Sequence, residues 1–195
     1  MSSESEGGER ADQYDCTARL LESTPDALVV SNLGVASYVL AGVKDRPRNF
    51  YLWGSMGVTT PVGMGLAMAR DDPVAVLDGD GSTLMSMGVF ATLGTYDPPN
   101  LTVVVWDNSG YATTGGQTAN AEAVDFAAVA EDCGLHAAHV ADGEAFQRAY
   151  EEAVAHDGAA VVVSDVDRVD PEARPPFDFA HVKRRFRDAV LDGEE

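Results

Sequence analysis

Short apolar runs alternate with longer amphipathic segments along most of this chain of 195 residues. Compact runs rich in β-branched residues predict strands at 27–31, 50–53, 74–78, 101–106, 137–141 and 159–164. Apolar residues at helical spacing predict helices at 14–22, 35–42, 60–70, 84–94, 123–133, 144–156 and 179–191. Strands that are apolar throughout and alternate with helices are typical of parallel sheets buried on both faces. The sequence therefore predicts an α/β fold, doubly wound, with a mostly parallel sheet of about six strands flanked by helices.

The predicted elements form one domain between two segments of different composition. Residues 1–11 are rich in Ser, Glu and Gly, and we expect them to form a disordered acidic tail. Residues 12–170 carry the alternating pattern and are expected to form the domain, which has the usual size of one α/β unit. Residues 171–195 begin with a proline-rich stretch and continue into the last predicted helix.

The charged residues bear on partners and surroundings. The chain has 32 acidic and 13 basic residues, a formal charge of −19, and only two lysines, Lys44 and Lys183. Nucleic acids and anionic membranes would repel such a chain and are not expected as partners. No apolar run approaches the roughly 20 residues that span a bilayer, and the first ten residues do not resemble a secretory signal, so we expect a cytoplasmic protein. An acidic, lysine-poor surface is typical of halophilic proteins.

Oxygen-bearing residues follow the ends of two neighbouring predicted strands. In an open parallel sheet, ligands bind beyond the carboxyl ends of the strands. Asp80 offers a carboxylate, Asn108 an amide oxygen, and Gly110 a backbone carbonyl, which together make half of an octahedral Mg²⁺ shell. Either segment alone could be a surface turn, since Gly, Asn and Asp are common turn residues. The pair, 28 residues apart with one helix and one strand between, favours a metal site that a diphosphate and water would complete.

These segments resemble a known family. Residues 79–82 (GDGS) followed by 107–111 (DNSGY) resemble the diphosphate-binding motif of thiamine-diphosphate enzymes. Residues 53–57 (WGSMG) are similar to the pyrimidine-contacting segment in the decarboxylase branch of that family. More narrowly, the segments resemble the small (beta) subunit of sulfopyruvate decarboxylases and the corresponding C-terminal half of phosphonopyruvate decarboxylases. The resemblance covers about residues 25–165 and implies the diphosphate-binding (PP) domain of these enzymes.

The resemblance implies roles for the residues around the expected metal. Asp80 and Asn108 would bind Mg²⁺ through their side chains, and Gly110 through its carbonyl. Gly81 and Ser82 would hold phosphate oxygens of thiamine diphosphate. The implied cofactors are therefore thiamine diphosphate and Mg²⁺.

The resemblance also implies contacts to the rings of the cofactor. Gly54 would accept a hydrogen bond from the aminopyrimidine through its carbonyl, and Met56 would be the apolar wedge that holds the cofactor bent. A methionine suits that place because its flexible thioether fills an irregular gap without adding a charged or strongly polar group. The remaining cofactor-binding candidates are Ser55, Gly79 and Tyr111.

The turn after the first predicted strand departs from the family pattern. Leu33 and Val35 stand where other branches often carry hydroxyl residues that contact the phosphate. Asn32 or Ser37 could supply that contact instead.

The resemblance further implies that this chain is one part of a split enzyme. In the family, a glutamate on a separate pyrimidine-binding domain drives ionisation of the cofactor, so no catalytic residue is expected in this chain. Only 52 residues precede Trp53, and they already include the first strand of this domain. We therefore expect a pyrimidine-binding alpha subunit as partner, most simply in an α₂β₂ heteromer or a multiple of it. The substrate would be a small 2-oxo acid, decarboxylated at a site between the chains.

Two other functions stay open. The chain could be a subunit of an acetolactate-type carboligase, or a non-catalytic subunit that binds the cofactor or serves as a scaffold. The beta subunit of a ferredoxin-coupled oxidoreductase is disfavoured, because two distant cysteines, Cys16 and Cys133, cannot hold an iron–sulfur cluster. A sulfonate or phosphonate substrate would need a cationic pocket, which the partner would have to supply.

The split leads to a first prediction. The purified chain, given thiamine diphosphate and Mg²⁺, is expected to show no decarboxylase activity, because the ionising glutamate lies on another chain. The measurement is CO₂ release from pyruvate and its 3-substituted analogues. Turnover by the single chain would contradict the split.

Overall fold

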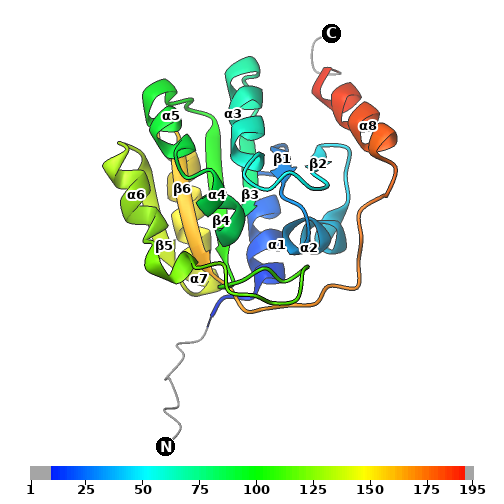
Figure 1. Cartoon of the computed structure of the whole chain (residues 1–195). Coiled ribbons are helices and arrows are strands. Elements are labelled where there is room, and N and C mark those ends of the chain that lie inside the picture. Colours follow the sequence, from blue (N-terminus) through cyan, green and yellow to red (C-terminus); the bar gives the residue numbers. More distant parts are fainter. Residues whose placement is uncertain (1–9, 192–195) are drawn as a thin grey trace, which may run out of the picture.

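The computed structural model describes residues 10–191, and its centre is one six-stranded parallel sheet (Figure 1). The sheet order is β2-β1-β3-β4-β6-β5, and every neighbouring pair is parallel. The strands are β1 (Leu28–Ser31), β2 (Asn49–Tyr51), β3 (Val74–Gly79), β4 (Leu101–Asp107), β5 (His136–Val140) and β6 (Ala160–Asp165). The predicted α/β fold with six strands is confirmed.

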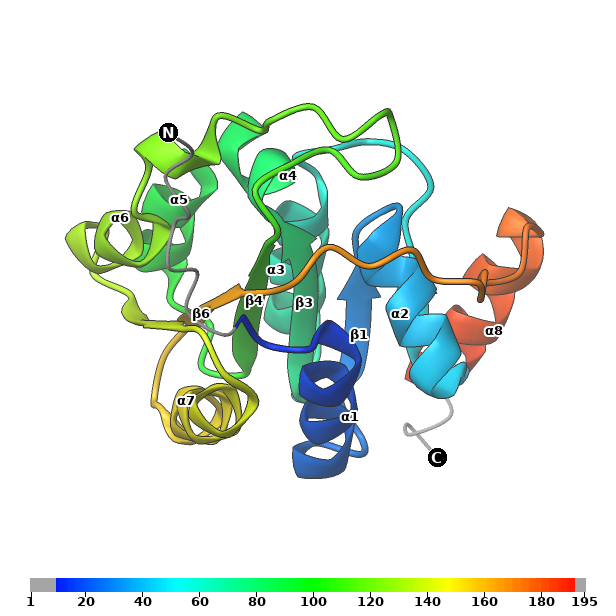
Figure 2. The ribbon, with the colours of Figure 1, turned by 90° about the horizontal axis from the view of Figure 1, so that it is seen from below.

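Helices cover both faces of the sheet, which is why the central strands are apolar along their length (Figure 2). One face is covered by α1 (Gln13–Ser23), α2 (Val35–Lys44) and α7 (Gly143–Ala155). The other is covered by α3 (Thr59–Ala69), α4 (Asp80–Met85), α5 (Val89–Tyr96) and α6 (Phe126–Asp132), with the short 3₁₀ helix η1 (Ala121–Ala123) before α6. The core is therefore divided into two apolar layers by the sheet.

The strand order reverses next to β1. From β1 the chain crosses over one face through α2 to β2, whereas β3, on the other side of β1, continues directly into α4 on the opposite face. The segments that leave β1 and β3 therefore diverge. Such a switch point opens a crevice at the carboxyl ends of the strands.

One predicted helix is wrong in its bounds. The sequence predicted a single helix over 84–94, but the structure has two, α4 and α5, separated by residues 86–88. α4 begins at Asp80, directly after β3, because a carboxylate is favourable in the first turn of a helix. Gly88 lies at the second boundary, since glycine weakens a helix interior.

The segment predicted as one helix over 123–133 is also divided. The chain forms η1, then an extended residue, and only then α6. Asp125 marks the new start because its carboxylate accepts the Ala128 N–H at 3.0 Å and so caps α6.

The last residue of the expected N-terminal tail, Ala11, is part of the fold. Residues 1–9 lie outside the described part of the chain. Ala11 is buried and bridges Val166, and its N–H donates to the Asp165 carbonyl at 3.0 Å. The ordered chain therefore includes the end of the segment that composition assigned to the tail.

Helix α8 (Phe179–Leu191) covers the edge of the sheet at β2. The ring of Phe186 packs on Phe50 with centroids 5.1 Å apart, and the Arg185 guanidinium binds the Asp45 carboxylate at 2.8 Å. Before α8, the chain passes along α2, where the Arg174 guanidinium lies 4.0 Å from the centroid of the Tyr38 ring. A covered edge cannot pair with another strand. Within residues 10–191, no helix is long and apolar enough to cross a membrane.

Two glycines of α3 give a matched test of the packing of this helix on β3. A Cβ on Gly63 would lie 2.1 Å from Cγ2 of the buried Val76, whereas a Cβ on Gly65 would meet nothing within 4 Å. Gly63→Ala is therefore expected to lower the free energy of unfolding by about 1–3 kcal/mol through overpacking. Gly65→Ala should raise it by about 0.5–1 kcal/mol, because alanine favours the helix. Chemical denaturation measures both, and a change in the same direction for the two variants would contradict the close approach.

Candidate functional site

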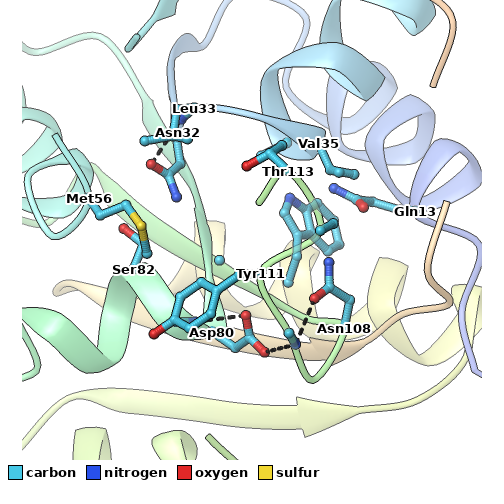
Figure 3. Close-up of a pocket in the computed structure, with 16 residues that line it drawn as sticks. Gln13, Asn32, Leu33, Val35, Met56, Asp80, Ser82, Asn108, Tyr111 and Thr113 are labelled. Atoms are coloured by element: carbon cyan, nitrogen blue, oxygen red, sulfur yellow. Dashed lines mark hydrogen bonds between the residues drawn. The ribbon is translucent and has the colours of Figure 1, made fainter. Parts of the chain in front are cut away.

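A pocket opens at the switch point, beyond the carboxyl ends of β1, β3 and β4 (Figure 3). Its walls come from the start of α1, the turn into α2, the loop after β2, the β3–α4 junction and the segment after β4. The lining residues are Gln13, Asn32, Leu33, Val35, Ala36, Met56, Gly79, Asp80, Gly81, Ser82, Trp106, Asn108, Gly110, Tyr111, Ala112 and Thr113.

Most of the site residues predicted from the sequence lie together in this pocket. They are Met56, Gly79, Asp80, Gly81, Ser82, Asn108, Gly110 and Tyr111. Gly54 and Ser55 do not line it; both are exposed on the loop after β2, with φ of 89° and 64°. Of the two substitutes for the missing hydroxyls, Asn32 lines the pocket, whereas the Ser37 hydroxyl is turned to the Asn32 carbonyl at 2.6 Å.

The centre of the pocket is a hydrogen-bond donor shared by two oxygens. The Gly110 N–H donates to Oδ2 of Asp80 at 3.0 Å and to Oδ1 of Asn108 at 3.1 Å (Figure 3). The other oxygen of Asp80 accepts the Gly81 N–H at 2.7 Å. A carboxylate and a carboxamide from two successive βα corners therefore point to one place. Oxygens of these two types are ligands that Mg²⁺ uses in proteins.

The turn after β4 is held in an unusual conformation. Ser109 has φ of 57°, in the left-handed region, and its N–H donates to the Asp107 carboxylate at 2.9 Å. Tyr111 then folds back over α4, so close that a Cβ on Gly81 would lie 2.3 Å from its Cε1 atom. Gly81 is therefore required by the tyrosine ring, whatever the pocket binds. Strained backbone of this kind is concentrated at functional sites.

The Arg168 side chain hydrogen-bonds to the same turn, and this residue was not predicted from the sequence. Its Nε donates to the Asn108 carbonyl at 2.9 Å, and its Nη2 donates to the Ser109 carbonyl at 2.6 Å. The available signal was its place just past β6, the strand beside β4. A basic residue is rare in this chain, so one at that position was worth attention.

The loop after β2 is anchored at both ends. Trp53 packs on Phe177, just before α8, and on Phe179, the first residue of α8, with ring centroids 4.2 and 5.8 Å away. At the other end, the Gly57 N–H donates to Oγ of Ser82 at 2.9 Å. Met56, between these anchors, reaches the pocket (Figure 3).

The electrostatics of the pocket are negative. Burial, and then the nearby Asp107 carboxylate, raise the pKa of Asp80 to about 6. Behind it, burial raises the pKa of the fully buried Asp78, although hydrogen bonds from Ser82, the Gly79 N–H and Thr60 oppose that shift. No lysine or arginine is among the lining residues. A cation between Asp80 and Asn108 would relieve the repulsion.

The donor set also fits a metal that is bound together with a ligand. Within residues 10–191, no group of three His, Cys, Asp or Glu side chains converges as a metal site. A metal ion here would therefore have one carboxylate, the amide oxygen of Asn108 and backbone or ligand oxygens around it. Mg²⁺ is usually bound in this way, by one or two carboxylates with phosphate oxygens and water.

Comparison with protein families and curated proteins gives consistent matches. The family described as "Thiamine pyrophosphate enzyme, C-terminal TPP binding domain" matches residues 32–164. The chain is 34% identical over 180 residues to "Sulfopyruvate decarboxylase subunit beta" of Methanococcus maripaludis, covering 91% of this chain and 97% of that protein. It is 42% identical over 138 residues to the protein of the same name from Methanothermobacter thermautotrophicus, covering 71% and 75%.

Other relatives are longer than this chain. "Phosphonopyruvate decarboxylase" of Streptomyces viridochromogenes is 42% identical over 173 residues, which cover 87% of this chain and 44% of that protein. Among solved structures, the thiamine diphosphate-dependent 4-hydroxybenzoylformate decarboxylase of Rhodococcus jostii RHA1 matches with a TM-score of 0.74 and 21% identity. That match covers 87% of this chain and 35% of the other, and at this identity it shows the likeness of fold.

The raised pKa of Asp80 predicts how stability changes with pH. The folded protein binds this proton more tightly than an unfolded chain, whose aspartate has a pKa near 3.8. The stability that this group contributes is therefore full below about pH 4 and is lost as the pH rises through about 6. Asp80→Asn removes the charge but keeps one of the two acceptors. We expect it to stabilise the metal-free protein at pH 7.5 by about 1–2 kcal/mol, with the gain vanishing toward pH 4.

Chemical denaturation in EDTA at several pH values measures this effect. Asp157→Asn, on an exposed turn, is the matched control and should change stability by less than about 0.5 kcal/mol at each pH. A stability difference between Asp80→Asn and wild type that stays the same from pH 4 to pH 7.5 would show that the carboxylate is not repelled in its site.

Proposed function

Because the chain belongs to the thiamine pyrophosphate enzymes, as their C-terminal TPP-binding domain, and is a homologue of sulfopyruvate decarboxylase beta subunits, we propose that it is the diphosphate-binding subunit of a two-subunit, Mg²⁺-dependent 2-oxoacid decarboxylase. The observation that carries the proposal is the convergence of Asp80 and Asn108 on the Gly110 N–H. That convergence supports a site where a metal ion holds a diphosphate. The subunit has the lyase activity only as part of the assembly.

The residues of the pocket fit a metal-bound diphosphate. Asp80 and Asn108 would hold Mg²⁺ with their side-chain oxygens, and Gly110 with its carbonyl. Gly81 and Ser82, in the first turn of α4, would contact phosphate oxygens. When bound, thiamine diphosphate supplies a carbon nucleophile and a sink for the electrons released with CO₂. The task of this chain is to fix the tail of the cofactor and so the position of its rings.

The loop after β2 would meet the rings. Met56 reaches the pocket from between two anchors, as an apolar support for the bent cofactor requires. Gly54 and Ser55 are exposed on the same loop, where a pyrimidine shared with another subunit would lie. Both have positive φ, which glycine adopts readily and serine rarely.

A partner subunit is implied by the beta naming of the relatives, and the surface supports one. An apolar groove runs between α3 and the α4–α5 pair, next to the loop after β2. Its walls include Met68, Met85 and Tyr96, each more than half exposed. Exposed apolar surface of this kind marks interaction sites. We propose that a pyrimidine-binding alpha subunit covers this groove and brings the glutamate that ionises the cofactor.

The substrate class is a small 2-oxo acid. The relatives are named for sulfopyruvate and phosphonopyruvate, both with a second anionic group. Because no lysine or arginine lines the pocket of this chain, that group would be bound by the partner. An acetolactate-type carboligase would use the same tail-binding residues, and the product of the assembled enzyme distinguishes the two.

The setting of the enzyme is proposed from its surface charge. The chain has 32 acidic residues and only two lysines. This supports a cytoplasmic enzyme that works at high salt, where a strongly acidic surface keeps a protein hydrated.

Substitution of the two metal-binding candidates tests the proposal. Asp80→Ala and Asn108→Ala are each expected to weaken Mg²⁺-dependent binding of thiamine diphosphate at least about 100-fold, because each removes a metal ligand. Calorimetric titration of the full chain measures the affinity. Asn120→Gly is the control: it removes an exposed carboxamide outside the pocket and keeps a residue suited to its left-handed backbone. Unchanged binding in both alanine variants would rule out the metal assignment.

Reconstitution tests the activity itself. The chain mixed with its alpha partner should release CO₂ from a 2-oxo acid, and the two alanine variants should abolish this release. Formation of a carboligation product with no aldehyde would favour the carboligase. Cofactor binding without either product would leave a non-catalytic role.

A further inference from the structure

One buried side chain of the pocket has no partner for either of its polar atoms. Gln13 is the first residue of α1 and is only 1% exposed, yet neither Nε2 nor Oε1 makes a hydrogen bond. It is not needed to cap the helix, because Asp12 accepts the Tyr14 N–H at 2.7 Å. Its amide end is turned toward the pocket (Figure 3). An amide buried without a partner costs free energy, so such a group in a cavity calls for a ligand.

A second unpartnered donor lines the same wall. The indole N–H of Trp106, at the end of β4, is buried and makes no hydrogen bond. The neighbouring lining residues Leu33, Val35 and Ala36 have no polar side-chain atoms to pair with these two donors. Gln13 and Trp106 thus give the pocket two neutral side chains with unpartnered N–H donors.

Two neutral donors suit an anionic oxygen whose charge is balanced elsewhere. Asp80 is the only acidic side chain among the lining residues, and no lysine or arginine lines the pocket. A free anion would be repelled by Asp80, whereas a diphosphate bound to a metal ion would not. Its outer oxygens would still need donors, and hydrogen bonds to charged oxygens are the strong ones.

The layout of the pocket decides which end of the diphosphate meets Gln13. Met56 and Gln13 lie on opposite sides of the pocket, with Asp80 and Asn108 between them (Figure 3). If Met56 supports the rings, the metal holds the middle of the cofactor and the tail extends toward α1. The terminal phosphate would therefore lie on the side of the pocket where Gln13 is.

We propose that the Gln13 amide, together with the Trp106 indole N–H, binds the terminal phosphate of the cofactor. This inference rests on the proposed function and adds a phosphate contact from α1, an element outside the sequence motifs. Gln13 then binds the diphosphate tail and does so in place of a basic side chain.

The test compares two buried polar residues of α1. Gln13→Leu removes the amide at nearly constant volume. Thr17→Val is the matched control: Thr17 lies one turn on, is equally buried, has an unpartnered hydroxyl and does not line the pocket. The probes are thiamine diphosphate and thiamine monophosphate with Mg²⁺, titrated into the full chain. Thermal unfolding of the metal-free chain gives a second measurement.

Gln13→Leu is expected to weaken thiamine diphosphate binding about 10- to 100-fold. It should change the affinity for thiamine monophosphate far less, since that probe lacks the terminal phosphate. The unfolding temperature of the metal-free variant should rise, because an unpartnered amide becomes apolar. Thr17→Val should leave both affinities unchanged.

A spectroscopic measurement keeps the proposal testable even with a poorly folding variant. In the wild-type chain, the indole N–H resonance of Trp106 should shift when Mg²⁺ and thiamine diphosphate are added, and not with thiamine monophosphate. The chain has two tryptophans, so Trp53→Phe assigns the signal.

Three outcomes overturn the proposal. Equal affinity of Gln13→Leu and wild type would show that the amide does not touch the cofactor. A lower unfolding temperature with equal losses for both probes would make Gln13 a structural residue only. Failure of the wild-type chain to bind either probe, even when mixed with its alpha partner and Mg²⁺, would refute the proposed function as well, which separates that failure from the other two.

Discussion

The structure of the site depends on one backbone N–H that two side chains share. The Gly110 N–H can donate to both Asp80 and Asn108 only because β3 and β4 pair in a register that places Gly79 opposite Trp106. The residues that follow those two strand ends then leave the sheet side by side. A slip of one residue would turn the side chains of one strand to the other face and separate the two oxygens. The apolar sheet therefore fixes the polar centre.

That centre is arranged at a cost to the metal-free protein. Asp80 is buried beside another carboxylate, Ser109 has a left-handed backbone, and Gln13 has no hydrogen-bond partner. Each of these features is unfavourable alone. A cation with an anionic ligand would compensate the buried carboxylate and the unpartnered amide, whereas the backbone of Ser109 is held by its bonds to Asp107 and Arg168. Natural proteins accept such local strain where function needs it. Unfavourable features of the described structure are therefore concentrated around this pocket.

The sequence was sufficient for the sheet and for the pair at the centre of the pocket. Valine-rich runs are typical of buried strands, and Asp80 and Asn108 follow such runs directly. The carboxyl ends of neighbouring parallel strands lie at one edge of the sheet, so the two residues are expected to come together. The split between α4 and α5 was missed because the apolar stripe continues across Gly88. Gln13 could not be found, since a glutamine at a helix start is ordinary and its burial depends on packing against distant elements. The contact of Arg168 with the turn after β4 depends on β6 lying beside β4, and the hydrophobic periodicity of the sequence does not reveal strand order.

The segment after β6 reaches both loops of the site. Arg168 holds the turn after β4, and Phe177 holds Trp53 in the loop after β2. Translation makes both loops before it makes this segment. A nascent chain can thus form the whole parallel sheet while the walls of its cavity are still unfastened. The contacts that hold these walls can form only after the stretch that follows the last strand has left the ribosome.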